Sequence, residues 1–186
     1  MILVNGDSFT VGEESSIAWP SLIPGTVNIA TSGASNDHIM SSTVFYVQTQ
    51  IKPDYVIVAW SSPDRIDIGG KHLTATSQDR YGKTLIDEVF KNWNSEWARL
   101  KFLTQIDLLH GFLESKDIPH LFVSTFDIQT WAQGPMEDFY LGWPKEGIVE
   151  WMGDCPKGPG GHPLELGHQR IAERINEHIR HLGWIS

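Results

Sequence analysis

Short apolar runs alternate with segments of helical periodicity along the whole chain, and this alternation constrains the fold more than any other feature. The runs cover residues 1–4, 26–30, 55–60 and 121–126. Strands that alternate with helices pair in parallel through right-handed crossovers. The pattern therefore predicts an α/β fold, a doubly wound three-layer α/β/α sandwich with a mostly parallel sheet of four to five strands. A fifth strand is expected within 146–152.

Helical periodicity fills the segments between these runs. Apolar residues recur every three or four positions in 37–50 and in 85–113. The second segment predicts one long helix or two helices broken near 92–95. A closing amphipathic helix carries one apolar stripe opposite its charged side chains. The stripe comprises Ile171, Ile175, Ile179 and Leu182.

The length of 186 residues predicts a single domain, 1–186, since a chain of this size can bury a core without metal or disulfide staples. Residues 127–161 break the alternation and are interpreted as an aromatic-rich insertion or lid. Its aromatic residues are Trp131, Phe139, Tyr140, Trp143 and Trp151. Such rings provide stacking surfaces, so we expect the insertion to shape a binding surface as well as to contribute to the core.

A formal net charge of −9 argues against partners that bind through phosphate charge, so neither nucleic acid nor an acidic membrane surface is expected. The single Cys155 cannot form an intrachain disulfide, and the fold therefore does not depend on an oxidising compartment. The sequence shows no signal peptide and no run of about 20 apolar residues, which predicts a cytoplasmic or otherwise soluble protein. No cofactor is expected.

The turn after the first apolar run brings Ser8 to the carboxyl end of a predicted buried strand. Open α/β sheets bind their ligands at this edge. Gly6 allows a sharp exit from the strand, which can lift the serine hydroxyl clear of the sheet. Ser8 is therefore a candidate nucleophile, although Ser8 or Asp7 at such a turn can also simply cap the next helix.

Two short motifs at opposite ends of the chain together resemble the SGNH, or GDSL, hydrolase superfamily. They are Gly-Asp-Ser at 6–8 and His-Pro at 162–163, the second just before the closing helix. Asn-Ile-Ala-Thr-Ser-Gly at 28–33 is similar to the second block of that superfamily, with Gly33 as its oxyanion glycine. The resemblance spans the whole chain in outline.

The resemblance implies the flavodoxin-like SGNH hydrolase fold and a serine esterase. Ser8 would attack an ester carbonyl, and His162 would take its proton and return it to the leaving alcohol. The backbone N–H groups of Ser8 and Gly33 would hold the oxyanion. The expected substrate is a small-molecule or glycan ester, and the aromatic insertion favours an O-acyl group, such as acetyl, on a carbohydrate.

The chain departs from the superfamily pattern in the third block, where Gly-x-Asn-Asp is expected and Ser-Ser-Pro-Asp stands at 61–64. Pro63 replaces the oxyanion asparagine and has no N–H to donate. Loss of one oxyanion donor costs about 10²–10³ in rate in other enzymes. Either Ser61, Ser62 or Asn36 substitutes as donor, or the activity is modest.

A second departure concerns the acid that orients the histidine. The superfamily carries this acid three residues before the histidine, where Pro159 stands here. Asp154 is the nearest upstream carboxylate, and a segment rich in glycine and proline separates it from His162. Asp154 is therefore the candidate for the third member of a triad.

Two alternatives stay open at this point. One is a non-catalytic module of the same fold that uses the aromatic insertion to bind a glycan or a protein. The other is a metal site, whose ligands would be Asp154, Cys155, His162 and His168, at a spacing that matches no structural zinc motif. Asp64 and Arg65, after the central strand, could form an ion pair or anchor a carboxylate substrate.

Overall fold

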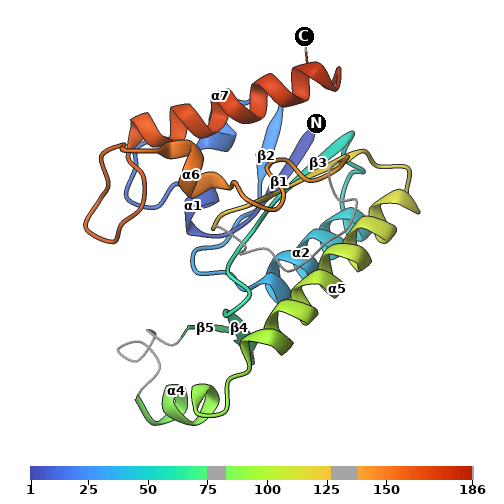
Figure 1. The fold of residues 1–186 in the computed structure, drawn as a ribbon. Helices are drawn as coiled ribbons and strands as arrows, with labels where there is room; N and C mark the ends of the chain where they lie inside the picture. The colour runs from blue at the N-terminus through green and yellow to red at the C-terminus, as the bar shows by residue number, and fades with distance from the viewer. Residues whose placement is uncertain (75–82, 127–137, 186) are drawn as a thin grey trace.

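The computed structural model describes residues 1–74, 83–126 and 138–185, and its centre is a parallel sheet of four strands in the order β2-β1-β3-β6 (Figure 1). The strands are β1 (Ile2–Asn5), β2 (Thr26–Asn28), β3 (Tyr55–Trp60) and β6 (His120–Ser124). From β1, the chain adds β2 on one side of the sheet and β3 and then β6 on the other, as in doubly wound sheets. The predicted α/β fold with a parallel sheet is confirmed.

The central strand β3 is buried along most of its length because helices cover both faces of the sheet. Ile57 and Ala59 point into the core cluster on one face, whereas Val56 and Val58 point into the cluster on the other. This division follows from the two-residue side-chain period of a strand. The unbroken apolar run at 55–60 thus reflects burial on both sides.

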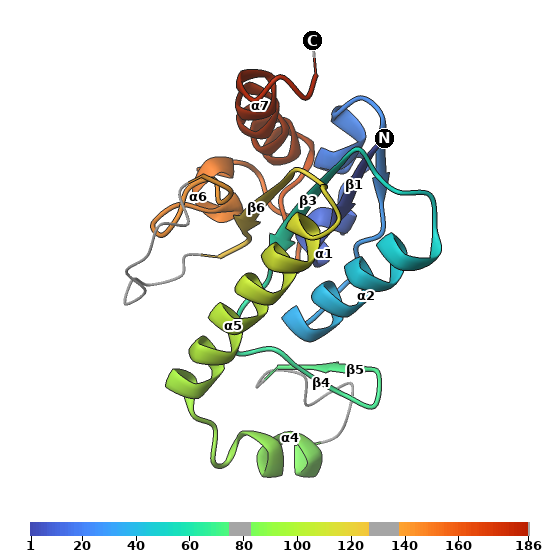
Figure 2. The same cartoon turned by 90° about the vertical axis from the view of Figure 1, so that its right-hand side faces the viewer.

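The helices form one layer on each face of the sheet, as Figure 2 shows from the side. One layer contains α1 (Ser8–Val11), the 3₁₀ helix η1 (Trp19–Leu22), α6 (Ile148–Met152) and α7 (Glu165–His181). The other contains α2 (Asn36–Thr49) and α5 (Ser95–Glu114). In the described ranges, no helix has the combination of length and apolar character that a membrane crossing requires.

The segment between β3 and α5 leaves the sheet and forms a small hairpin followed by a helix (Figure 1). Its elements are β4 (Ile66–Ile68), the antiparallel β5 (Lys71–Leu73) and α4 (Lys83–Phe90). The predicted helical segment 85–113 is therefore two helices, α4 and α5. The break occurs where Asn94 caps α5, since its Oδ1 accepts a hydrogen bond from the backbone N–H of Trp97 at 2.9 Å.

The prediction of a fifth strand within 146–152 is wrong, because residues 148–152 form α6. The Glu150 carboxylate accepts a hydrogen bond from the backbone N–H of Gly147 at 2.7 Å and so stabilises the first turn of the helix. The sheet is extended instead by a single parallel bridge between Phe122 of β6 and Tyr140. A short apolar run does not by itself distinguish a strand from a helix.

The described part of the predicted aromatic insertion packs into the core. Tyr140 is 2% exposed, and the half-buried Phe139 and Trp143 pack against the same cluster. Trp151 packs against the cluster on the opposite face of the sheet. Trp131 lies outside the described residues. The described aromatic residues thus contribute to stability rather than to an exposed stacking surface.

Candidate active site

Strand β1 brings Ser8 to the carboxyl edge of the sheet through a turn that requires glycine. A Cβ on Gly6 would lie 2.3 Å from Thr10 Oγ1, so a larger residue does not fit without displacing its neighbours. Asp7 caps the short helix α1 by accepting a hydrogen bond from the backbone N–H of Phe9 at 3.1 Å. The helix cap predicted at this turn is therefore Asp7, and Ser8 follows it as the first residue of α1.

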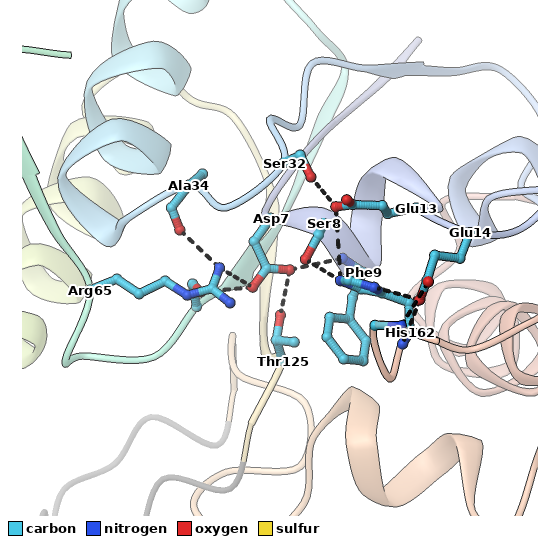
Figure 3. Close-up of polar contacts among 12 residues, drawn as sticks. Asp7, Ser8, Phe9, Glu13, Glu14, Ser32, Ala34, Arg65, Thr125 and His162 are labelled. Carbon is cyan, nitrogen blue, oxygen red and sulfur yellow. Dashed lines mark hydrogen bonds and ion pairs between the residues drawn. The ribbon is translucent and has the colours of Figure 1, made fainter. Parts of the chain in front are cut away.

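His162 lies in the loop before α7, 154 residues after Ser8 in sequence and beside it in space (Figure 3). Its Nε2 is 2.9 Å from Ser8 Oγ. Phe9 packs against the imidazole, with ring centroids 5.2 Å apart. The structure thus brings together the serine and the histidine of the two predicted motifs.

The second imidazole nitrogen of His162 faces Glu14, with Nδ1 3.0 Å from Glu14 Oε2. The same carboxylate accepts hydrogen bonds from the backbone N–H groups of Gly160 at 2.7 Å and of His162 at 3.2 Å. These hydrogen bonds, led by that of Gly160, hold the pKa of Glu14 below its ordinary value. The group facing Nδ1 is therefore a carboxylate at neutral pH.

Asp154 does not occupy this position. It is exposed in the loop after α6, and both ring nitrogens of His162 are engaged by Ser8 and Glu14. The superfamily pattern pointed to a carboxylate upstream of the histidine, whereas the one that faces Nδ1 belongs to the loop after α1. Gly12, with a φ of +84°, ends α1 in the left-handed conformation and redirects the chain before the acid.

The backbone at Glu14 is itself unusual, with a φ of +67°. Residues other than glycine adopt this region rarely, and when they do they are enriched at functional sites. The facing loop is shaped to admit the side chain, because a Cβ on Gly158 would lie 2.7 Å from the Glu14 carboxyl carbon. The sequence offered one signal for this residue, a pair of consecutive glutamates soon after the serine.

Behind the serine, the fully buried Asp7 holds the ends of three strands together (Figure 3). Its carboxylate accepts hydrogen bonds from Ser61 Oγ at 2.7 Å, from Arg65 Nη1 at 3.1 Å and from Thr125 Oγ1 at 3.4 Å. Burial raises the pKa of Asp7, and the Arg65 guanidinium is the strongest influence in the opposite direction. Arg65, predicted to bind an acidic group, pairs here with a residue of the protein itself.

The side chains considered as substitutes for the oxyanion asparagine make other hydrogen bonds. Asn36 Nδ2 donates to the Ser61 carbonyl at 3.0 Å, and Asn36 Oδ1 accepts from the Ser61 N–H at 2.8 Å. The Ser61 hydroxyl donates to Asp7. Ser62 Oγ accepts from the Asp64 N–H at 3.3 Å. Asn36 and Ser61 therefore connect α2 to the end of β3.

Among the described residues, neither the backbone N–H of Ser8 nor that of Gly33 donates to a protein acceptor. Gly33 lies in the turn between β2 and α2 with a φ of +74°. A Cβ placed there would meet nothing within 4 Å, so the space around it is open. These groups have the chemistry needed to bind an oxyanion.

A second carboxylate, that of Glu13, lies beside Ser8 and His162 and was not anticipated from the sequence. Its Oε2 is 3.8 Å from His162 Nε2, the nitrogen that faces Ser8. The same oxygen accepts a hydrogen bond from the Ser32 hydroxyl, next to Gly33 in the chain. The Glu13 side chain is 45% exposed, so its charge faces the solvent.

A cavity of about 550 Å³ is lined in part by Arg65 and Phe126, and its described lining does not include Ser8 or His162. Phe126 contacts Phe9 edge to face with ring centroids 5.5 Å apart, and Phe9 in turn contacts His162, so one ring lies between this wall and the imidazole. The remaining wall residues are Ser62, Asp64, Thr74, Phe90, Trp93 and Ser95. This volume is typical of sites for small molecules.

The metal site considered from the sequence is not assembled. His162 is engaged by Ser8 and Glu14, and the buried His168 accepts a hydrogen bond at Nδ1 from the backbone N–H of Trp19 at 3.2 Å. Burial lowers the pKa of His168 to about 4. In the described part of the chain, the groups of metal-ligand side chains that converge are formed by other residues.

No family model matches the chain, and no curated protein matches it. Solved structures similar to it include a GDSL-like lipase from Bacteroides thetaiotaomicron, at 14% identity and a TM-score of 0.37, over 97% of this chain and 88% of that chain. A member of the lipolytic protein G-D-S-L family from Veillonella parvula is 13% identical, with a TM-score of 0.39, over 95% of this chain and 96% of that chain. TesA is 14% identical, with a TM-score of 0.44, over 97% of this chain and 98% of that chain.

Proposed function

We propose that this protein is a serine esterase of the SGNH type, with Ser8 as nucleophile, His162 as general base and Glu14 as the acid that orients the base. The observation that carries this proposal is the unbroken series of contacts from Ser8 Oγ to His162 Nε2 at 2.9 Å and from His162 Nδ1 to Glu14 Oε2 at 3.0 Å. A hydroxyl is a poor nucleophile at neutral pH, and this series supplies both a base and a fixed ring orientation.

The reaction proceeds in two halves. His162 Nε2 accepts the Ser8 proton while Oγ bonds to the ester carbonyl carbon, and the imidazolium then gives that proton to the leaving alcohol as the C–O bond breaks. Water, deprotonated by His162, next attacks the acyl carbon and releases the carboxylic acid and the free serine. Glu14 accepts the hydrogen bond of Nδ1–H throughout and stabilises the imidazolium.

The oxyanion is bound by the backbone N–H groups of Ser8 and Gly33. In this proposal Asn36 and Ser61 support the edge of the sheet through the hydrogen bonds between them, and the oxyanion is held by the two backbone donors. Loss of one donor costs about 10²–10³ in rate in other enzymes, so we expect the turnover number to be modest.

We infer that the larger part of the substrate occupies the cavity beside Arg65. Phe90, Trp93 and Phe126 present aromatic side chains in its wall, which favours an ester that carries a ring, and we propose an O-acetylated carbohydrate as the substrate class. The support for a carbohydrate thus comes from this cavity. The described aromatic residues of 138–161 give no such support, because they pack in the core.

Esterase assays of the wild type and of S8A test this proposal. We expect the wild type to hydrolyse p-nitrophenyl acetate and an O-acetylated monosaccharide, with the higher kcat/KM for the sugar ester, and S8A to have lost both activities. Unchanged turnover by S8A would contradict the catalytic assignment. Binding of the sugar ester by wild type and S8A alike, without hydrolysis, would indicate a binding module instead.

A further inference from the structure

Three side chains of metal-ligand type converge at the edge of the sheet opposite to Ser8. His110 and Glu114 lie one turn apart on α5 and therefore on the same face of the helix, and His120 begins β6. One ligand atom from each residue lies within 4.8 Å of the other two. His120 is at the amino end of its strand, whereas Ser8 follows the carboxyl end of the parallel β1, so the cluster is separate from the candidate active site (Figures 1 and 2).

The hydrogen bonds of His120 orient its ring as in a metal ligand. Nδ1 is 3.0 Å from the Ile118 carbonyl oxygen, which can only accept, so the ring proton resides on Nδ1. The lone pair of Nε2 then points to His110, whose Nδ1 is 2.7 Å away. Metal-binding histidines are commonly fixed by such a hydrogen bond from the nitrogen that does not bind the ion.

The three side chains differ in exposure: the histidines are buried or half-buried, and the glutamate is open to solvent. His120 is 6% exposed, and the half-buried His110 stacks on Phe139 with ring centroids 3.9 Å apart. Glu114 is exposed. The two imidazoles are thus held by the core, while the carboxylate side is free for the entry of an ion and a water molecule.

We propose that His110, Glu114 and His120 bind one transition-metal ion of the zinc class, with water as the fourth ligand. Two imidazole nitrogens and one carboxylate oxygen suit Zn²⁺ better than Mg²⁺ or Ca²⁺, which prefer oxygen ligands. The ion replaces the hydrogen bond between the imidazoles, and His110 then carries its proton on Nε2. The bound ion connects the last turn of α5 to the first residue of β6.

The rearrangement that this requires is small. Zn–N bonds of about 2.0 Å in a tetrahedral site separate two ligand nitrogens by about 3.3 Å. The present separation of 2.7 Å therefore increases by about half an ångström. Because His110 is half-buried, a small shift of its ring within the plane of its stack on Phe139 can supply this movement.

Calorimetric titration of the metal-free full-length protein with ZnCl₂, and in parallel with MgCl₂, tests the proposal. We expect one equivalent of Zn²⁺ to bind and the Tm to rise, with neither effect for Mg²⁺. H110Q and E114Q should each lower the zinc affinity by at least about 10-fold. The E114Q variant keeps the test valid if H110Q folds poorly, because the Glu114 side chain is exposed.

A second convergent group, His38, Asp67 and His72, provides the matched control. H38Q should leave the zinc affinity of the proposed site unchanged. Failure of the wild type to bind Zn²⁺, or a loss of affinity in H38Q but not in H110Q and E114Q, would overturn the assignment. Ester hydrolysis measured on the same preparations should be equal in the wild type and H110Q, so a failure here is distinguishable from a failure of the proposed esterase activity.

Discussion

Ser8 Oγ lies 2.9 Å from His162 Nε2, although the two residues belong to the first helix and to the loop before the last one. Their contact is possible because β1 ends at the edge of the sheet where the loop before α7 also lies. Phe9 fixes the relative position of the two, since it follows Ser8 in the chain and packs on the imidazole.

Replacement of Glu14 by glutamine should lower kcat/KM for p-nitrophenyl acetate by as much as about 10⁴-fold, because the ring of His162 loses the charge that fixes its tautomer and stabilises the imidazolium. D154N is the matched control, and it should retain wild-type activity because Asp154 is exposed and has no contact with the ring. Steady-state kinetics of both variants decide between the two acids. A large loss in D154N with none in E14Q would contradict the role of Glu14.

The G158A variant tests the role of Glu14 by displacing its carboxylate, whereas E14Q removes the charge. The added Cβ would lie 2.7 Å from the Glu14 carboxyl carbon, so the carboxylate must move away from His162. Misplacement by about 1 Å can cost about 10²-fold in rate, and we expect a loss of that order in kcat. The added Cβ would also lie 2.8 Å from Glu14 Cβ, so the Tm should fall as well. G161A, which meets nothing within 4 Å but has a φ of +85°, gives the effect of backbone strain alone. Equal kcat values for G158A and the wild type would argue against the proposed geometry.

Glu13 should disfavour esters that carry a negative charge near the reacting carbonyl, because its carboxylate lies 3.8 Å from the His162 nitrogen that faces Ser8. We expect E13Q to raise kcat/KM for a hemisuccinate ester about fivefold relative to the neutral acetate of the same alcohol, the effect of about 1 kcal/mol between partly exposed charges. The ratio of the two kcat/KM values, measured at low and high salt, checks this. A ratio that E13Q leaves unchanged would show that Glu13 does not select substrates.

His168 should make the stability of the fold depend on pH. Burial lowers its pKa to about 4 from an ordinary value of 6.5, so between these values the unfolded chain binds a proton that the folded chain does not. The free energy of unfolding should therefore fall as the pH falls from about 7 to about 4, by about 3 kcal/mol at most, with no further contribution from His168 below that range.

Urea unfolding at several pH values measures this dependence. H168N removes the titrating group and keeps an oxygen that can accept the hydrogen bond of the Trp19 N–H, so its stability should vary less with pH than that of the wild type. H181Q, at an exposed position on α7, is the control and should behave as the wild type does. The same pH dependence in H168N and the wild type would contradict the assignment to His168.

The architecture was predictable because its determinants are local. The apolar run at 55–60 and the periodic helices record burial in the sequence itself. Local signals failed where a segment was short, as in α6, whose five residues carry an apolar pattern that fits a strand equally well. For residues 139–143 the aromatic side chains suggested a surface as well as a core, and the structure shows them packed in the core.

The candidate site was predictable in part. Ser8 and His162 stand in short motifs, whereas Glu14 acts through a contact between two loops that are 148 residues apart in the chain. The position of Glu14 depends on the left-handed turn at Gly12 and on the space that Gly158 leaves, and neither is visible as a pattern. The hydrogen bonds that engage Asn36 and Ser61 likewise depend on how α2 meets β3, which only coordinates reveal.

Covalent labelling with a serine-directed fluorophosphonate, followed by peptide mass spectrometry, measures directly whether His162 activates Ser8. We expect the wild type to gain one probe per chain, on Ser8, and H162Q to react at least about 10³-fold more slowly, because the hydroxyl has lost its base. No labelling of Ser8, or labelling at equal rates in the wild type and H162Q, would contradict this activation.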